Sequence, residues 1–199
     1  GSDLMGAGFI LPDDEARNIL EKNPSEREVL KPFLTGEDLN TRSDQSPSRW
    51  VVNFRQMTLG SAREFPLAIG IVEDRVRPYR ESRDDAGQFL LRKPLPQRWW
   101  QFNCPRLDSY AEVAKYSRVL VRAEVSNTHA FAFVRTDMEY SLTLYVFLYH
   151  LSRSFAVLQS SLHEHWARKY GSSMRTDLRY TPGRCFDPFP FPSNTEALD

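Results

Sequence analysis

The chain has 199 residues, of which 41% are hydrophobic and 13% aromatic, a composition that supports a buried core and excludes a disordered chain. Its formal net charge is zero, which argues against a nonspecific nucleic-acid binder, because such proteins usually carry an excess of basic residues. No apolar run approaches the roughly 18 residues of a membrane-spanning helix, and the N-terminus has no signal-peptide pattern. We expect a folded protein without a membrane partner.

The basic residues are concentrated in the middle of the chain. Residues 1–48 contain ten acidic and five basic side chains, whereas residues 49–122 contain eight acidic and fourteen basic ones. Arg accounts for 21 of the 26 basic residues, a bias that suits bidentate recognition of guanine, phosphate or carboxylate and that a GC-rich genome would also produce. Cys104 and Cys185 lack zinc-site spacing, which favours a reducing cytoplasm.

The first half of the chain predicts mainly helices. A helix should begin after Pro12, and a second is expected over 25–34, with Ser25 and Glu28 as its capping box and Thr35-Gly36 as its end. The spacing then predicts a strand over 50–54, a helix over 61–79 and a mobile loop over about 80–97.

The second half predicts a sheet followed by a helix. Expected elements are a helix over 108–116, strands over 118–125, 130–134 and 140–148, a helix over 155–170 and an extended strap over 186–192. The last helix carries an apolar stripe of Phe155, Leu158, Leu162 and Trp166 and should end at Gly171. These elements predict an α+β fold in which a mixed, largely antiparallel sheet has flanking helices.

Residues 172–180 are the most informative segment for function. If they form one strand, Met174, Thr176, Leu178 and Tyr180 lie on one face, and Arg175, Asp177 and Arg179 lie on the other. Same-face neighbours stand about 6.6 Å apart, close to two base-pair steps of B-form DNA, so this row could lie along base edges. The alternative is a solvated strand face with internal salt bridges.

Other candidate sites are weaker. Trp99 and Trp100, beside Arg98, could stack on bases, although adjacent Trp residues are more often core anchors. The turn from Ser126 to His129 is equally typical of a phosphate contact and of an ordinary solvated turn.

Motifs for catalysis and metal binding are not found in the sequence. His163 and His165 point about 200° apart on a helix and cannot share one metal ion, and no nucleophile arrangement or cofactor loop rises above chance. We expect no catalytic, cofactor-binding or metal-binding residues in this chain.

An ordered set of segments resembles a known family. The segments are Met5–Phe9, Val29–Asn40, Ser46–Phe54, Arg98–Gln101, Leu158–Arg168, Asp177–Pro182 and Phe189–Pro192. In this order they resemble the target recognition domain of MmeI-like restriction-modification enzymes and of the related phage-defence DNA adenine methyltransferases (PglX-like). Gly1-Ser2 looks like a remnant of tag cleavage, so the resemblance implies one domain over 3–199, excised from a larger methyltransferase.

The resemblance implies a module that reads double-stranded DNA for an N6-adenine methyltransferase, possibly with a nuclease, in a bacterium or archaeon. S-adenosylmethionine would bind in the methyltransferase domain of the parent chain, which is then a partner of this domain. Family base readers cluster just before the Arg-Tyr of the last strand, which corresponds here to Arg175 and Asp177.

The resemblance and the strand pattern together assign roles to individual residues. Arg175 would read guanine, and Asp177 would accept a hydrogen bond from cytosine or orient its Arg neighbours. The candidates for backbone or secondary contacts are Lys169, Ser172, Ser173, Arg179, Arg122, Ser126, Thr128, His129 and Arg98.

Two other classes of function remain open. In a protein-interaction module of a defence complex, the Arg-rich middle would dock an acidic partner and the Pro-Phe strap would form an interface. A hydrolase would need a cleft that the sequence does not show.

Overall fold

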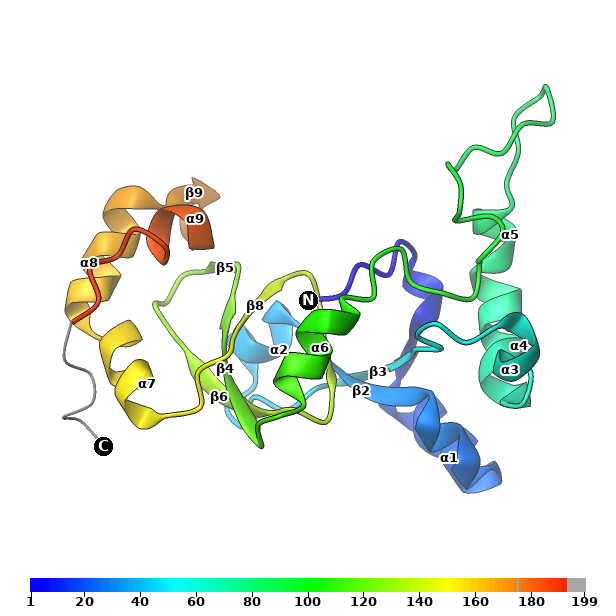
Figure 1. Ribbon diagram of the computed structural model, residues 1–199, viewed down its shortest axis with the longest axis horizontal. Helices are drawn as coiled ribbons and strands as arrows, with labels where there is room; N and C mark the ends of the chain where they lie inside the picture. The colour runs from blue at the N-terminus through cyan, green and yellow to red at the C-terminus, as the bar shows by residue number, and fades with distance from the viewer. Residues whose placement is uncertain (175, 193–199) are drawn as a thin grey trace. The chain divides into compact units, whose positions relative to one another are not determined.

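Two sets of antiparallel strands, each with its own buried side chains, organise the protein (Figure 1). The structure is a computed structural model that describes residues 1–174 and 176–192. Unit 1 contains Gly1, Leu34–Ser46 and the described residues from Asp108 onward, and unit 2 contains Ser2–Phe33 and Pro47–Leu107. Antiparallel strands with flanking helices confirm the predicted α+β class.

Unit 2 is built on three strands that lie side by side in the order β1, β3, β2. Their bounds are β1 (Ile10–Pro12), β2 (Leu30–Leu34) and β3 (Arg49–Val52). The helices of the unit are η1 (Ala7–Phe9), α1 (Asp13–Lys22), η2 (Pro24–Glu28), α3 (Leu59–Ala62), α4 (Pro66–Arg75) and α5 (Arg77–Arg80).

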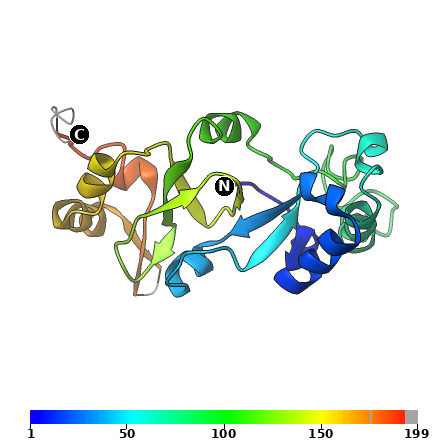
Figure 2. The ribbon, with the colours of Figure 1, turned by 90° about the horizontal axis from the view of Figure 1, so that it is seen from below.

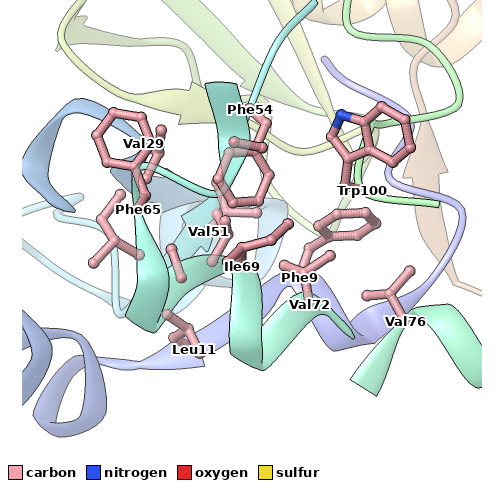
Figure 3. Close-up of a cluster of buried hydrophobic side chains, with 14 of the residues drawn as sticks. Phe9, Leu11, Val29, Val51, Phe54, Phe65, Ile69, Val72, Val76 and Trp100 are labelled. Atoms are coloured by element: carbon pink, nitrogen blue, oxygen red, sulfur yellow. The ribbon is translucent and has the colours of Figure 1, made fainter. Parts of the chain in front are cut away.

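The core of unit 2 forms between the sheet and α4. Val51 of β3 and Ile69 and Val72 of α4 point into one cluster, where Phe9 and Trp100 join them (Figure 3). The Trp100 indole donates a hydrogen bond to the Met57 carbonyl at 2.9 Å, and Trp99 is buried as well. The prediction that these Trp residues are core anchors is confirmed.

Unit 1 contains a sheet in which β4 lies between β6 and β8 (green to yellow in Figure 2). Its strands are β4 (Arg118–Ala123), β6 (Ala132–Arg135) and β8 (Leu144–Phe147), with the short β7 (Glu139–Tyr140) between the last two in sequence. The helices of the unit are α2 (Gly36–Thr41), α6 (Leu107–Val113), α7 (Ser152–Leu158), α8 (Ser161–Tyr170) and α9 (Pro182–Cys185).

Both faces of β4 are buried. Val119, Val121 and Ala123 pack into one cluster, and Leu120 packs into a second cluster with Leu158, Leu178 and Tyr180. Phe186 and Phe191 of the C-terminal strap pack against the second cluster, and Phe189 contacts Phe191, which confirms the predicted packing of that strap. The polar positions of the alternating pattern on β4 therefore face a core instead of solvent. The strap is not extended as predicted, because residues 186–189 form a turn in which the Phe189 N–H donates to the Phe186 carbonyl.

The predicted helix over 25–34 is wrong. Asn23 caps η2, and the chain then enters β2, where Leu30–Phe33 pair with Arg49–Val52. Pro32, which lacks a backbone N–H, tolerates a strand better than the interior of a helix. Thr35 begins a helix instead of ending one, because its side chain and that of Asp38 form the capping box of α2.

Two predicted long helices are each divided. The helix over 61–79 becomes α3, α4 and α5. Phe65, which precedes Pro66, lies outside the helical region, and Pro78 has no N–H to continue the hydrogen bonds of α4. The helix over 155–170 becomes α7 and α8, and Ser160 caps the second. The break shifts the helical phase, so Leu162 is 69% exposed and does not join the predicted apolar stripe.

The segment over 81–97 contains no helix or strand, as the sequence predicts. It is nevertheless locally organised, because the Arg83 guanidinium stacks 3.8 Å from the Phe89 ring and Asp84 accepts hydrogen bonds from the amides of Ala86 and Gln88.

Glu26 stabilises unit 2 from a fully buried position. Its two carboxylate oxygens accept the backbone N–H groups of Leu67 and Ala68 at 3.0 and 3.1 Å, at the start of α4, whose N-cap residue Phe65 provides no side-chain hydrogen bond. A carboxylate at this end also interacts favourably with the helix dipole.

Replacing Glu26 with Gln should lower the free energy of unfolding by about 1–3 kcal/mol, because the amide has one accepting oxygen and leaves one helix N–H unsatisfied. Urea unfolding followed by circular dichroism measures this loss. Glu28→Gln is the matched control, since Glu28 is exposed, and it should change stability by less than about 0.5 kcal/mol. Equal effects of the two variants would show that the cap is unimportant.

Candidate nucleic-acid interface

The segment after Gly171 forms a hairpin and not the single strand that the sequence predicts. Strand β9 (Ser172–Met174) pairs antiparallel with β10 (Asp177–Arg179), so Met174 stands opposite Asp177 and Ser172 opposite Arg179. Strand β10 also pairs with β5 (Val125–Ser126), which gives the sheet order β5, β10, β9.

The alternation of β10 is as predicted. Leu178 and Tyr180 are buried, whereas Arg179 is exposed and Asp177 is partly exposed on the opposite face. Met174 was expected on the buried face, but as the cross-strand partner of Asp177 it shares the exposed one. Arg175, the predicted guanine reader, lies outside the described residues.

Gly171 allows the hairpin to approach the helix before it. It is the C-cap of α8, as predicted, and a Cβ atom there would lie 2.5 Å from the Ala167 carbonyl oxygen and 2.9 Å from a methyl group of Leu178. Only glycine permits this contact between helix and hairpin. The position of β9 and β10 is therefore set by packing against α8 (Figure 1).

Arg179 has a partner within the protein. Its Nε donates to the Glu124 carboxylate at 2.8 Å. Glu124 interrupts the strand between β4 and β5, and its backbone is held on both sides: its N–H donates to the Thr143 carbonyl and its carbonyl accepts from Tyr180, each at 2.8 Å. Arg179 is therefore engaged in an ion pair before any ligand binds.

Three predicted backbone-contacting residues lie at the junction of α8 and β9. Lys169 and Ser173 are exposed and Ser172 is half-buried. Arg184 of α9, which packs against α8, is a further exposed cation that the sequence interpretation missed. Within the part of the chain that the structure describes, neither Lys169 nor Arg184 has a carboxylate partner.

Arg122 and His129 are buried, which leaves no surface for the predicted contact with DNA. The Arg122 guanidinium lies 4.6 Å from the centre of the Tyr180 ring, and burial lowers the pKa of Arg122 to about 10, so it remains charged at neutral pH. His129 Nε2 donates to the Leu158 carbonyl at 2.8 Å. Arg122 is buried because its face of β4 packs against a core.

The side chain of Ser126, at the start of the turn after β5, forms hydrogen bonds within the turn itself. Ser126 is 4% exposed, and its hydroxyl bonds to the Thr128 hydroxyl and accepts the Thr128 N–H, both at 3.2 Å. Thr128 itself is exposed. In unit 2, Arg98 is exposed on a segment that the buried Trp99 and Trp100 hold in place.

A buried aromatic cluster packs around Tyr180, the residue that follows β10. The His163 ring lies parallel to Tyr180, and its Nε2 is 3.0 Å from the Tyr180 hydroxyl. Burial, with smaller effects of His129 and Arg122, lowers the pKa of His163 to about 4. Burial also lowers the pKa of His129. Both rings are therefore neutral at physiological pH, and the cluster carries one charge, that of Arg122.

Among the residues described, no group of His, Cys, Asp and Glu side chains is arranged to hold a metal ion. In the same residues, none of the helices has the length and apolarity needed to cross a bilayer.

Comparison with known proteins identifies the family. The sequence matches the family described as "MmeI, target recognition domain" over residues 2–193. The chain belongs to this family. It is a target recognition domain, and the resemblance seen in the sequence is confirmed.

A solved structure shows the same fold. The chain is similar, with a TM-score of 0.74 and 17% identity over 100% of its length, to the structure described as "Structure of Type IIL restriction-modification enzyme MmeI in complex with DNA has implications for engineering of new specificities". It covers 25% of that longer chain. Comparison with curated proteins gives no match.

The buried His163 should make the domain sensitive to acid. As the pH falls from about 6.5 toward 4, the unfolded chain binds a proton at residue 163 while the folded chain does not, so stability decreases by up to about 2–3 kcal/mol. His163→Gln should remove this part of the pH dependence. Urea unfolding at pH 7.5, 6 and 4.5 measures it.

His165→Gln is the control, because His165 is exposed on the same helix. It should leave the pH dependence unchanged. If His163→Gln has the same pH profile as the original chain, then residue 163 does not cause the loss of stability in acid.

Proposed function

We propose that this target recognition domain reads double-stranded DNA through the exposed face of the β5, β10, β9 sheet, with Asp177 and Arg175 as the base-contacting residues. The observation that supports this most is the partial exposure of Asp177, whose side chain has no hydrogen bond or ion pair among the described residues. A partly exposed carboxylate on a strand is suited to accept from a cytosine amino group in the major groove.

The remaining roles follow from chemistry and exposure. Arg175 enters on its sequence position and would donate to O6 and N7 of guanine. Lys169, Ser172 and Ser173 lie beside the hairpin, where contacts to phosphate would fix the register of the sheet without reading sequence. Arg184 joins them by its exposure. Thr128 and Arg98 remain secondary candidates, whereas the buried Arg122, His129 and Ser126 are not retained.

The parent protein supplies the chemistry in this proposal. It would be an N6-adenine DNA methyltransferase, with or without a nuclease domain, that binds S-adenosylmethionine in a separate domain and acts in the cytoplasm of a bacterium or archaeon. The longer length of the solved relative, which is described as bound to DNA, supports a larger parent.

The proposal is tested by selecting bound sequences from a random duplex pool at low salt and sequencing them. Asp177→Asn should cost about 1–3 kcal/mol on the selected site and relax the preference at one base pair, because the amide donates where the carboxylate accepts. Arg175→Ala should relax a different base pair by a similar amount. Binding to unselected DNA should change little in either variant.

Asp108→Asn is the matched control, since Asp108 is exposed on α6, and it should keep the selected sequence unchanged. A selected motif that survives both hairpin substitutions would refute base reading by this face. Binding without any enriched sequence would favour a role in contacting phosphate or a protein partner.

A further inference from the structure

The ion pair between Glu124 and Arg179 lies beside the proposed base-reading carboxylate. Arg179 follows Asp177 by two residues on β10, so their side chains project from the same face of the strand. Such neighbours stand about 6.6 Å apart, a distance that an Arg side chain can span. Arg179 therefore has two carboxylates within reach, that of Glu124 and that of Asp177.

The structure shows which carboxylate Arg179 selects. The Arg179 Nε is 2.8 Å from a Glu124 oxygen, and Asp177 has no side-chain partner among the described residues. The Glu124 side chain is 23% exposed, so this ion pair is partly removed from water. Ion pairs that are partly removed from water are screened less than exposed ones.

The backbone of Glu124 is held in place by hydrogen bonds. Its N–H is bonded to Thr143, next to β8, and its carbonyl to Tyr180, next to β10. The residue is thereby fixed to both sheets of unit 1. Its side chain therefore starts from a backbone position that hydrogen bonds hold on both sides.

We propose that Glu124 is a positioning residue that holds Arg179 away from Asp177 and so keeps the Asp177 carboxylate available to a base. This inference rests on the proposed function of Asp177. It assigns Glu124, which does not contact DNA in this proposal, a role in specificity. It also assigns Arg179 to the internal pair and not to a phosphate.

The first experiment needs no DNA. The pKa of the Asp177 carboxyl is measured by NMR titration in the original chain, in Glu124→Gln, in Arg179→Gln and in the double variant. Glu124→Gln should lower the pKa of Asp177, because Arg179 becomes its partner, and the double variant should restore the pKa. A pKa of Asp177 that is the same in Glu124→Gln and in the double variant would overturn the inference.

The second experiment measures discrimination at the base pair that Asp177→Asn relaxes. Glu124→Gln should reduce this discrimination about tenfold, and the additional Arg179→Gln substitution should recover most of it. A residue that merely stabilises the fold would give a double variant at least as poor as each single one. Glu124→Asp, which keeps the charge, should retain more discrimination than Glu124→Gln.

The outcomes separate this inference from the proposal beneath it. If Asp177→Asn relaxes a base pair and Glu124→Gln does not, positioning by Glu124 is overturned while base reading by Asp177 stands. If Arg179→Gln weakens all duplexes equally and the double variant does the same, Arg179 is a phosphate contact and the inference fails. If Asp177→Asn has no effect on discrimination, both proposals fail.

Discussion

The hairpin of unit 1 depends on Tyr180, the residue that follows β10. Its backbone N–H binds the Glu124 carbonyl, its hydroxyl meets His163, and its ring lies against the Arg122 guanidinium. Because Tyr180 is fully buried, these contacts fix the end of β10 to β4, α8 and the core between them. The exposed side chains of the hairpin are thus attached to a support that cannot shift without disturbing the core, which is what accurate base reading requires.

The same contacts bury several polar nitrogens without hydrogen-bond partners among the described residues, which is unfavourable for stability. Among the residues that the structure describes, Nε and Nη2 of Arg122 have no hydrogen-bond partner, and the same holds for Nδ1 of His129 and Nδ1 of His163. The guanidinium is compensated in part by the aromatic faces of Tyr180 and Phe131. The two histidines must then stay neutral, since a second positive charge beside Arg122 would be unfavourable. The acid sensitivity of the domain follows from this arrangement.

The sequence predicted the elements whose signals are local and missed those that tertiary contacts decide. The start of α1, the strand β4 and the end of α8 at Gly171 follow from caps and periodicity. The strand β2 was taken for a helix because Ser25 and Glu28 resemble a capping box, and only pairing with β3 favours the extended form. Leu162 was assigned to the apolar stripe because one continuous helix over 155–170 was expected, whereas Ser160 caps a second helix.

The sequence also predicted the candidate site only in part. Period-two alternation correctly separated Asp177 and Arg179 from Leu178, but it carried the same strand back through Met174, where the structure has the partner strand. The burial of Arg122 could not be predicted from the sequence. Alternation along a strand separates the residues of its two faces, but it does not show which other elements cover each face. Glu124 gave no local signal, since its importance comes from Arg179, which is 55 residues away in sequence.

In the proposed interface, different residues determine the affinity for the DNA backbone and the specificity for the base sequence. Two exposed cations close to the hairpin are paired within the protein, Arg168 with Glu164 and Arg179 with Glu124. Among the described residues there, Lys169 and Arg184 are left for phosphates. Each phosphate contact adds to the salt dependence and strength of DNA binding. A surface with few such contacts binds weakly by itself and gains little from DNA of the wrong sequence. The net charge of zero is therefore consistent with a sequence reader whose hold on the backbone is shared with the rest of its enzyme.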